Sequence, residues 1–197
     1  MSSLHLIGLA GTAGSGKDTA AELLCTMFGM QNLSTSDALR AITRYTYNMP
    51  ADVLPVRQQL FEVGTFMRTT INPATLVQLC ILQAQVLQLN RAVISGLRSM
   101  GEAEAILAAG GTIVAIDADS RVRYERMFSR ARDADAQKTL EEFLLQDERE
   151  NKGISDRGPG RGIRSIVDSA DIVIVNNGSL EELKQELNHK IGPMLAQ

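Results

Sequence analysis

The sequence predicts an α/β fold in which a five-stranded parallel sheet lies between two layers of helices. Apolar runs typical of buried strands alternate with segments of helical periodicity, and this alternation requires right-handed crossovers between parallel strands. The first run leads directly into a glycine-rich turn and a helix, which places that strand in the sheet. The five predicted strands are at residues 4–10, 33–35, 92–95, 112–117 and 171–175.

The glycine-rich turn has the complete spacing G-x-x-x-x-G-K of a phosphate-binding loop, or P-loop. Glycines allow main-chain N–H groups to approach phosphate oxygens, and the start of the following helix adds a positive dipole end. A lysine at the helix start adds a mobile charge for the β- and γ-phosphates. The alternative is a strand-to-helix turn without a ligand. The predicted nucleotide-binding residues are Gly11, Thr12, Ala13, Gly14, Ser15, Gly16, Lys17, Asp18 and Thr19.

Asp18 follows the lysine at the position where this motif commonly has a Ser or Thr that binds magnesium. Asp18 is either an acid favoured by the helix dipole or a metal ligand. The pattern Gly-Lys-Asp-Thr resembles the Gly-Lys-Gly-Thr of nucleoside monophosphate kinases. The resemblance implies that Thr19 contacts a phosphate and that Mg²⁺ is held largely through water, so the metal ligands stay unassigned.

Composition predicts one domain over residues 1–197 that carries an insertion able to move. Of the 197 residues 44% are hydrophobic, and the net charge of −3 gives no electrostatic footprint for nucleic acid or an anionic membrane. The only two cysteines, Cys25 and Cys80, lie in apolar helical patterns and are expected to be buried thiols. The N-terminal apolar run is too short for a signal or membrane helix, so we expect a cytoplasmic protein.

Residues 36–90 form the predicted acceptor-binding region. Asp37 and Arg40 fall on one face of a helix, which by default is an ordinary surface pair. The string Leu-Ser-Thr-Ser-Asp-Ala-Leu-Arg resembles the Ser-Thr-Gly-Asp-x-Leu-Arg of adenylate kinases, which implies that Asp37 begins the acceptor helix and Arg40 holds the acceptor phosphate. Arg68, in the next helical segment, either closes on that phosphate or solvates a helix end.

Arg98 follows the strand at residues 92–95, and a capping box formed by Ser99 and Glu102 opens the next helix. In open parallel sheets, ligands collect beyond the carboxyl ends of the strands, so Arg98 is expected near the P-loop. Adenylate kinases have Asp-Gly-x-Pro-Arg at the matching point, which implies that Arg98 contacts the transferred phosphate or the acceptor. Ser95 replaces the acid of that motif, which shifts any metal role toward Asp37, Asp18 or water.

Three arginines, Arg123, Arg126 and Arg130, are spaced to form one cationic helix face, with only Glu125 and Asp133 near in sequence. Such a face is usually solvated. In the kinases that the chain resembles, an Arg-x-x-x-Arg at the mouth of the lid stacks on the donor base and reaches its phosphates. Arg126 and Arg130 match that pattern, which implies a catalytic role for both.

Residues 133–168 form the predicted lid. A capping box opens an acidic helix at residues 139–150, and residues 153–164 then hold four glycines and three arginines. A cationic loop of this kind can close over nucleotide and exclude water through arginines such as Arg157 and Arg161. The alternative is a disordered surface loop.

Beyond the lid, the last predicted strand ends in Asn-Asn-Gly, which is typical of a turn. A third capping box, formed by Ser179 and Glu182, then opens the terminal helix.

Most of the chain resembles P-loop nucleoside monophosphate kinases, and its layout also resembles P-loop proteins related to dephospho-CoA kinase. The resemblance implies transfer of a phosphoryl group from ATP, with Mg²⁺, to a nucleoside or deoxynucleoside monophosphate. Two alternatives stay open: a kinase for dephospho-CoA or another small metabolite, and a regulatory module that binds nucleotide without transfer, which Ser95 favours. The motifs specify neither the acceptor's base nor the oligomeric state.

Overall fold

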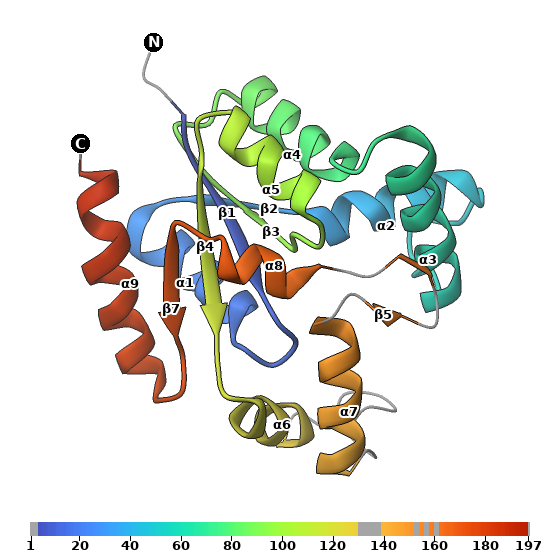
Figure 1. Ribbon diagram of the computed structural model, residues 1–197. Helices are drawn as coiled ribbons and strands as arrows, with labels where there is room; N and C mark the ends of the chain where they lie inside the picture. The colour runs from blue at the N-terminus through green and yellow to red at the C-terminus, as the bar shows by residue number, and fades with distance from the viewer. Residues whose placement is uncertain (1–3, 130–138, 152–153, 156–157, 160–161, 197) are drawn as a thin grey trace.

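The computed structural model describes residues 4–129, 139–151, 154–155, 158–159 and 162–196. Its central sheet has the strand order β2-β3-β1-β4-β7, with every neighbouring pair parallel (Figure 1). The five predicted strands and their parallel arrangement are confirmed. The strands are β1 (His5–Gly11), β2 (Gln31–Ser34), β3 (Arg91–Ser95), β4 (Thr112–Asp117) and β7 (Ile172–Val175).

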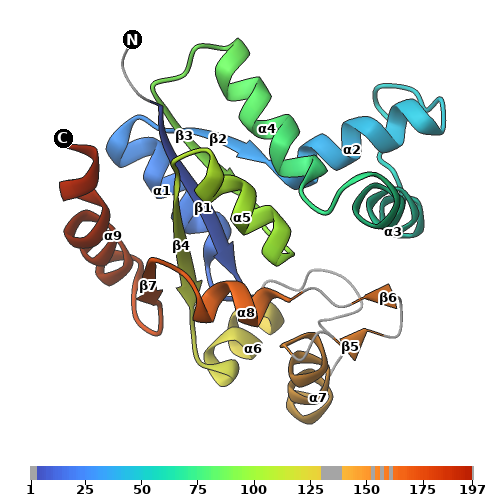
Figure 2. The same ribbon diagram turned by 45° about the horizontal axis from the view of Figure 1, so that its top comes forward.

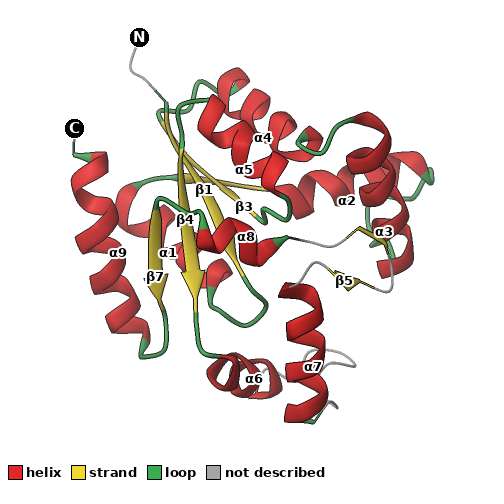
Figure 3. Cartoon of the chain, viewed as in Figure 1, coloured by secondary structure: helices red, strands yellow, loops and turns green. Residues whose placement is uncertain are grey.

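Helices cover both faces of this sheet, which gives the predicted three layers (Figure 3). On one face α1 (Lys17–Phe28) and α9 (Leu180–Leu195) pack on alternate residues of the strands. On the other face lie α4 (Thr75–Val86), α5 (Met100–Ala108) and α8 (Ile163–Asp168). Strand residues that are buried on both faces, such as Leu9 and Ile116 at 0% exposure, explain why the strands are continuous apolar runs.

The remaining elements lie beyond the sheet. The helical arm consists of α2 (Thr35–Thr46), α3 (Arg57–Phe66) and η1 (Met67–Ile71), a π-helical turn that continues α3. Val63 and Met67 of the arm form a small core with Leu76 of α4. Two further helices are α6 (Ser120–Ser129) and α7 (Leu140–Asn151), and a short hairpin joins β5 (Ile154–Ser155) to β6 (Gly158–Pro159). In Figure 2 the arm lies to one side of the sheet, and α7 and the hairpin lie together, apart from the arm.

Strand register brings the chemistry-bearing segments to one edge. Leu9 pairs with Ser95, and Gly11 pairs with Ile116, so β1, β3 and β4 end beside one another. The P-loop follows β1, the segment with Arg98 follows β3, and Asp117 ends β4. The segment with Arg98 therefore follows a strand that ends beside β1 and the P-loop, as its place after a parallel strand predicted.

Two of the three predicted capping boxes form as expected, at Thr139 with Glu142 and at Ser179 with Glu182. The third prediction was half wrong. Ser99 does cap the main-chain N–H of Glu102, but the Glu102 carboxylate does not return to the Ser99 N–H. It accepts from Arg68 Nε and from the main-chain N–H of Arg98 instead.

Candidate functional site

The P-loop has a backbone shape that its glycines permit. Gly14 and Gly16 adopt φ values of +78° and +92°, in the left-handed region that other residues rarely occupy. At Gly11 a Cβ atom would lie 2.6 Å from the carbonyl oxygen of Ile116, so the first glycine allows the loop to pass close to β4. Lys17 is the first residue of α1, which directs the positive end of the helix dipole toward the loop.

Two hydroxyls of the loop lack a partner in the described structure. Thr12 is 5% exposed and Ser15 is 0% exposed, and neither Oγ atom makes a hydrogen bond there. A buried polar group without a partner costs about 1–3 kcal/mol, so this arrangement favours an anion that accepts hydrogen bonds. The donor set of the loop thus fits a phosphate group.

Asp18 pairs with Lys17, whose Nζ lies 2.5 Å from Asp18 Oδ1. The Asp18 side chain is 79% exposed, whereas that of Lys17 is 19% exposed. An exposed ion pair of this kind contributes little to stability and is easily exchanged for another anion. The lysine is therefore held at the helix start by a contact that a phosphate can replace.

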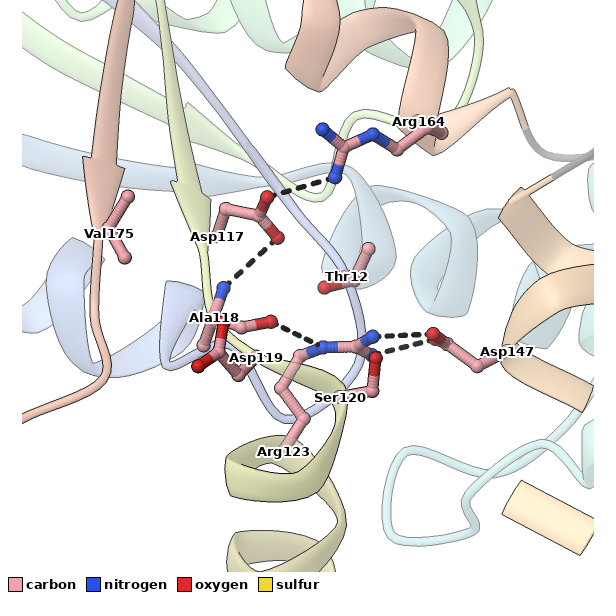
Figure 4. A pocket seen from close by; sticks show the side chains of 9 residues that line it. All are labelled: Thr12, Asp117, Ala118, Asp119, Ser120, Arg123, Asp147, Arg164 and Val175. Atoms are coloured by element: carbon pink, nitrogen blue, oxygen red, sulfur yellow. Dashed lines mark hydrogen bonds and ion pairs between the residues drawn. The ribbon is translucent and has the colours of Figure 1, made fainter. Parts of the chain in front are cut away.

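A cavity of about 290 Å³ lies beside the loop, at the ends of β4 and β7 (Figure 4). Thr12 and Asp117 line it together with Arg123, Asp147 and Arg164. Arg164 Nη1 donates to Asp117 Oδ2 at 2.9 Å, and its Nη2 lies 2.7 Å from Asp168 Oδ1. The pKa of Arg164 is raised, mainly by the hydrogen bond to Asp168. Burial lowers this pKa, and the hydrogen bond to Asp117 raises it.

The predicted cationic face of α6 is wrong for Arg123. This residue is 3% exposed and lies inside the molecule, where it makes a bidentate pair with Asp147 of α7 at 2.7 and 2.5 Å. Asp147 is 24 positions away along the chain, so the neighbours considered in the sequence did not include it. Arg126 donates to the carbonyl oxygens of Asn176 and Gly178 at 2.7 and 3.0 Å.

Asn176, at the end of β7, is a residue whose role the sequence did not suggest. It is 6% exposed, and its Nδ2 donates to the carbonyl oxygen of Ser15 at 2.8 Å. A Cβ atom at Gly16 would lie 2.3 Å from the same amide nitrogen. The sequence pattern Asn-Asn-Gly indicated only a turn, but its first residue supports the P-loop.

Next to the end of β3, the structure brings Arg68 and the main chain of Arg98 together at one carboxylate. Glu102 has a fully buried side chain, accepting from Arg68 Nε at 3.0 Å and from the Arg98 N–H at 2.5 Å. Arg40 pairs at 2.5 Å with Asp37 in its own helix, as the surface interpretation predicted. The sequence identified Glu102 only as a capping residue.

Other predicted residues lie outside this picture. Arg130, Arg157 and Arg161 fall outside the described residues. Among the residues that are described, no group of three or more His, Cys, Asp and Glu side chains is placed to hold a metal ion. No helix in the described ranges is long and apolar enough to cross a membrane.

Comparison with known proteins places this geometry in context. No family model matches the chain. A UPF0200 protein of Saccharolobus islandicus is 27% identical over 185 residues, covering 92% of this chain and 89% of its own. A UPF0200 protein of Aeropyrum pernix is 28% identical over 184 residues, with the same coverage.

Solved structures resemble the chain over nearly its whole length. The protein TT1252 of Thermus thermophilus superposes with a TM-score of 0.60 at 21% identity, covering 97% of this chain and 98% of its own. Shikimate kinase of Aquifex aeolicus gives 0.53 at 18%, covering 98% and 99%. The chain has the fold of P-loop kinases. A gluconokinase of Sinorhizobium meliloti also gives 0.53, at 14% identity and with coverage of 100% and 96%.

Proposed function

We propose that the protein is a kinase that transfers the γ-phosphoryl group of ATP to a small-molecule acceptor. The observation that carries the proposal is the P-loop itself, where two glycines with positive φ, two buried hydroxyls without partners among the described residues, and Lys17 lie in one turn between β1 and α1. The named kinases among the structural neighbours support a phosphotransferase of this kind.

Phosphoryl transfer needs in-line positioning and neutralisation of charge rather than a side-chain nucleophile. Lys17 and the loop N–H groups would hold the donor β- and γ-phosphates, with Thr19 as a further contact. Arg126, together with Arg130 and the lid arginines Arg157 and Arg161, would neutralise charge that develops during transfer. Each arginine that acts directly on that charge can contribute on the order of 10³ in rate.

ATP would bring Mg²⁺, which neutralises phosphate charge when it is bound. Ser95 supplies no carboxylate at the end of β3, and the Asp18 carboxylate is exposed and would leave Lys17 when a phosphate binds that lysine. These donors fit a magnesium ion held mainly by phosphate oxygens and water, with Asp37 as a further acidic candidate. The chain's own contribution is to orient the phosphates and exclude water.

The acceptor we propose first is a nucleoside or deoxynucleoside monophosphate. Arg40, Arg68 and Arg98 would bind the acceptor, and three arginines suit an acceptor that already carries a phosphate. The buried Glu102 fixes Arg68 and the Arg98 backbone, which supports a preformed site. Dephospho-CoA and a neutral or carboxylated metabolite are the alternatives, the latter favoured by the neighbours named shikimate kinase and gluconokinase.

A coupled ADP-release assay tests the proposal. The panel contains MgATP with ribo- and deoxyribonucleoside monophosphates, dephospho-CoA, shikimate and gluconate. Turnover that depends on one acceptor and is absent in Lys17→Ala is expected, while Lys184→Ala, which changes a half-exposed lysine on α9, keeps wild-type turnover. Nucleotide binding without stimulation by any acceptor would instead favour a regulatory module.

A further inference from the structure

Arg123 connects four parts of the donor end of the molecule. Its Nε donates to the carbonyl oxygen of Ala118 at 2.9 Å, in the turn between β4 and α6. Its Nη1 donates at 3.2 Å to the carbonyl oxygen of Ala13 in the P-loop, and both Nη atoms bind Asp147 of α7 (Figure 4). One buried guanidinium therefore contacts the loop, the turn and α7 from its place on α6.

The contact with Ala13 determines how the P-loop presents its donors. The chain has no cis peptide bond among its described residues, so the N–H of Gly14 points opposite to the Ala13 carbonyl. Holding that carbonyl on Arg123 thus directs the Gly14 N–H away from Arg123. Asn176 acts in the same way on the Ser15–Gly16 peptide. It holds the Ser15 carbonyl and so directs the Gly16 N–H.

Packing makes the position of Arg123 rigid. A Cβ atom at Gly14 would lie 2.7 Å from the Arg123 carbonyl oxygen, so the loop and α6 are in direct backbone contact. The guanidinium carbon lies 5.6 Å from the ring centre of Phe143, which is 8% exposed on α7. The side chains of Arg123 and Asp147 are 4% and 12% exposed, so water screens the pair only weakly.

We propose that Arg123 is a positioning residue for the donor phosphates and that Asp147 couples the docking of α7 to nucleotide binding. The inference rests on the proposed function, because it takes the P-loop as the donor site. With α7 docked, Asp147 fixes the guanidinium and hence the Ala13–Gly14 peptide. By reciprocity, nucleotide in the loop stabilises the docked position of α7.

The test measures MgADP binding by calorimetry in the wild type, in Asp147→Asn and in Arg123→Lys. Asn keeps the shape of Asp147 but removes its charge, and Lys cannot bind Asp147 and Ala13 through a planar fork. Both variants are expected to raise the Kd for MgADP about tenfold or more, within the range usual for coupled sites. Glu141→Gln, an exposed charge change on the same helix, is expected to leave the Kd unchanged.

Hydrogen exchange separates positioning from stability. In the wild type MgADP is expected to slow amide exchange in residues 140–148, and this slowing disappears in Asp147→Asn and Arg123→Lys. Variants that melt at lower temperature yet keep the wild-type Kd and the same slowing would overturn the inference. If one variant does not fold, the other gives the same two readings.

The two proposals fail differently in this experiment. Absence of MgADP binding in the wild type would refute the donor site and the proposed function with it. If the wild type binds MgADP and the Kd values of Asp147→Asn and Arg123→Lys both stay within twofold of the wild-type value, only the role of the pair is refuted.

Discussion

Glu102→Gln tests whether the buried carboxylate organises the proposed acceptor site. Glu102 accepts two hydrogen bonds, one from the guanidinium of Arg68 and one from the N–H of Arg98, and its side chain is fully buried. A glutamine has one carbonyl oxygen, so its NH₂ group must face one of these donors. The variant therefore retains the side-chain volume while one buried donor loses its partner.

The cost follows from these contacts. Removing one partner of a buried ion pair costs about 3–5 kcal/mol, and a single hydrogen bond to a charged group contributes about 1.5–3 kcal/mol. The Arg68 side chain is 24% exposed and can reach water, and glutamine keeps one acceptor. We therefore expect Glu102→Gln to lower the free energy of unfolding by about 2–3 kcal/mol, or Tm by roughly 5–10 °C in a chain of this length.

Thermal and urea unfolding measure this difference, with Glu104→Gln as the matched control on the same helix, where the side chain is exposed. The double variant Arg68→Met/Glu102→Gln should lose less than the sum of the two single variants, because it removes both charges of the pair. The reasoning is refuted if Glu102→Gln melts within about 1 °C of Glu104→Gln.

Two further predictions concern the loop and a buried thiol. Gly14→Ala should be less stable than Gly29→Ala and should lose tenfold or more in MgADP affinity. Both glycines have positive φ, but only at Gly14 would a Cβ atom meet backbone atoms, those of Arg123. Equal stability and affinity in the two variants would contradict the close approach. Burial raises the pKa of the Cys80 thiol from its ordinary value of 9.0 to about 11. The native state therefore keeps this proton to a higher pH than the unfolded chain does. The free energy of unfolding should therefore fall between pH 9 and 11 relative to Cys80→Ala, by at most about 1.4 kcal/mol per pH unit; parallel pH curves for the two proteins would exclude this.

The features that the sequence predicted correctly are those that local patterns determine. Five apolar runs predicted the strands, and glycine spacing before a helix predicted the P-loop backbone. Thr139 with Glu142 and Ser179 with Glu182 formed capping boxes, because in the described part of the chain no distant residue competes for either carboxylate.

The missed features depend on contacts between distant segments. Glu102 follows the spacing of a capping box, yet Arg68, 34 positions earlier, competes for its carboxylate because η1 and α5 both pack against α4. Arg123 looked like one member of an exposed face, because nothing in α6 indicates that α7 would return to cover it with Asp147. Side-chain pairing of this kind follows from the packing of whole elements, which periodicity does not encode.

Transfer of a labelled γ-phosphoryl group from ATP to the acceptor found in the panel tests the central claim most directly. We expect labelled product with the wild type and with Lys184→Ala, and none with Lys17→Ala, because this variant lacks the ammonium group at the start of α1. Label that appears only as inorganic phosphate, or equal transfer by Lys17→Ala, would contradict a P-loop kinase.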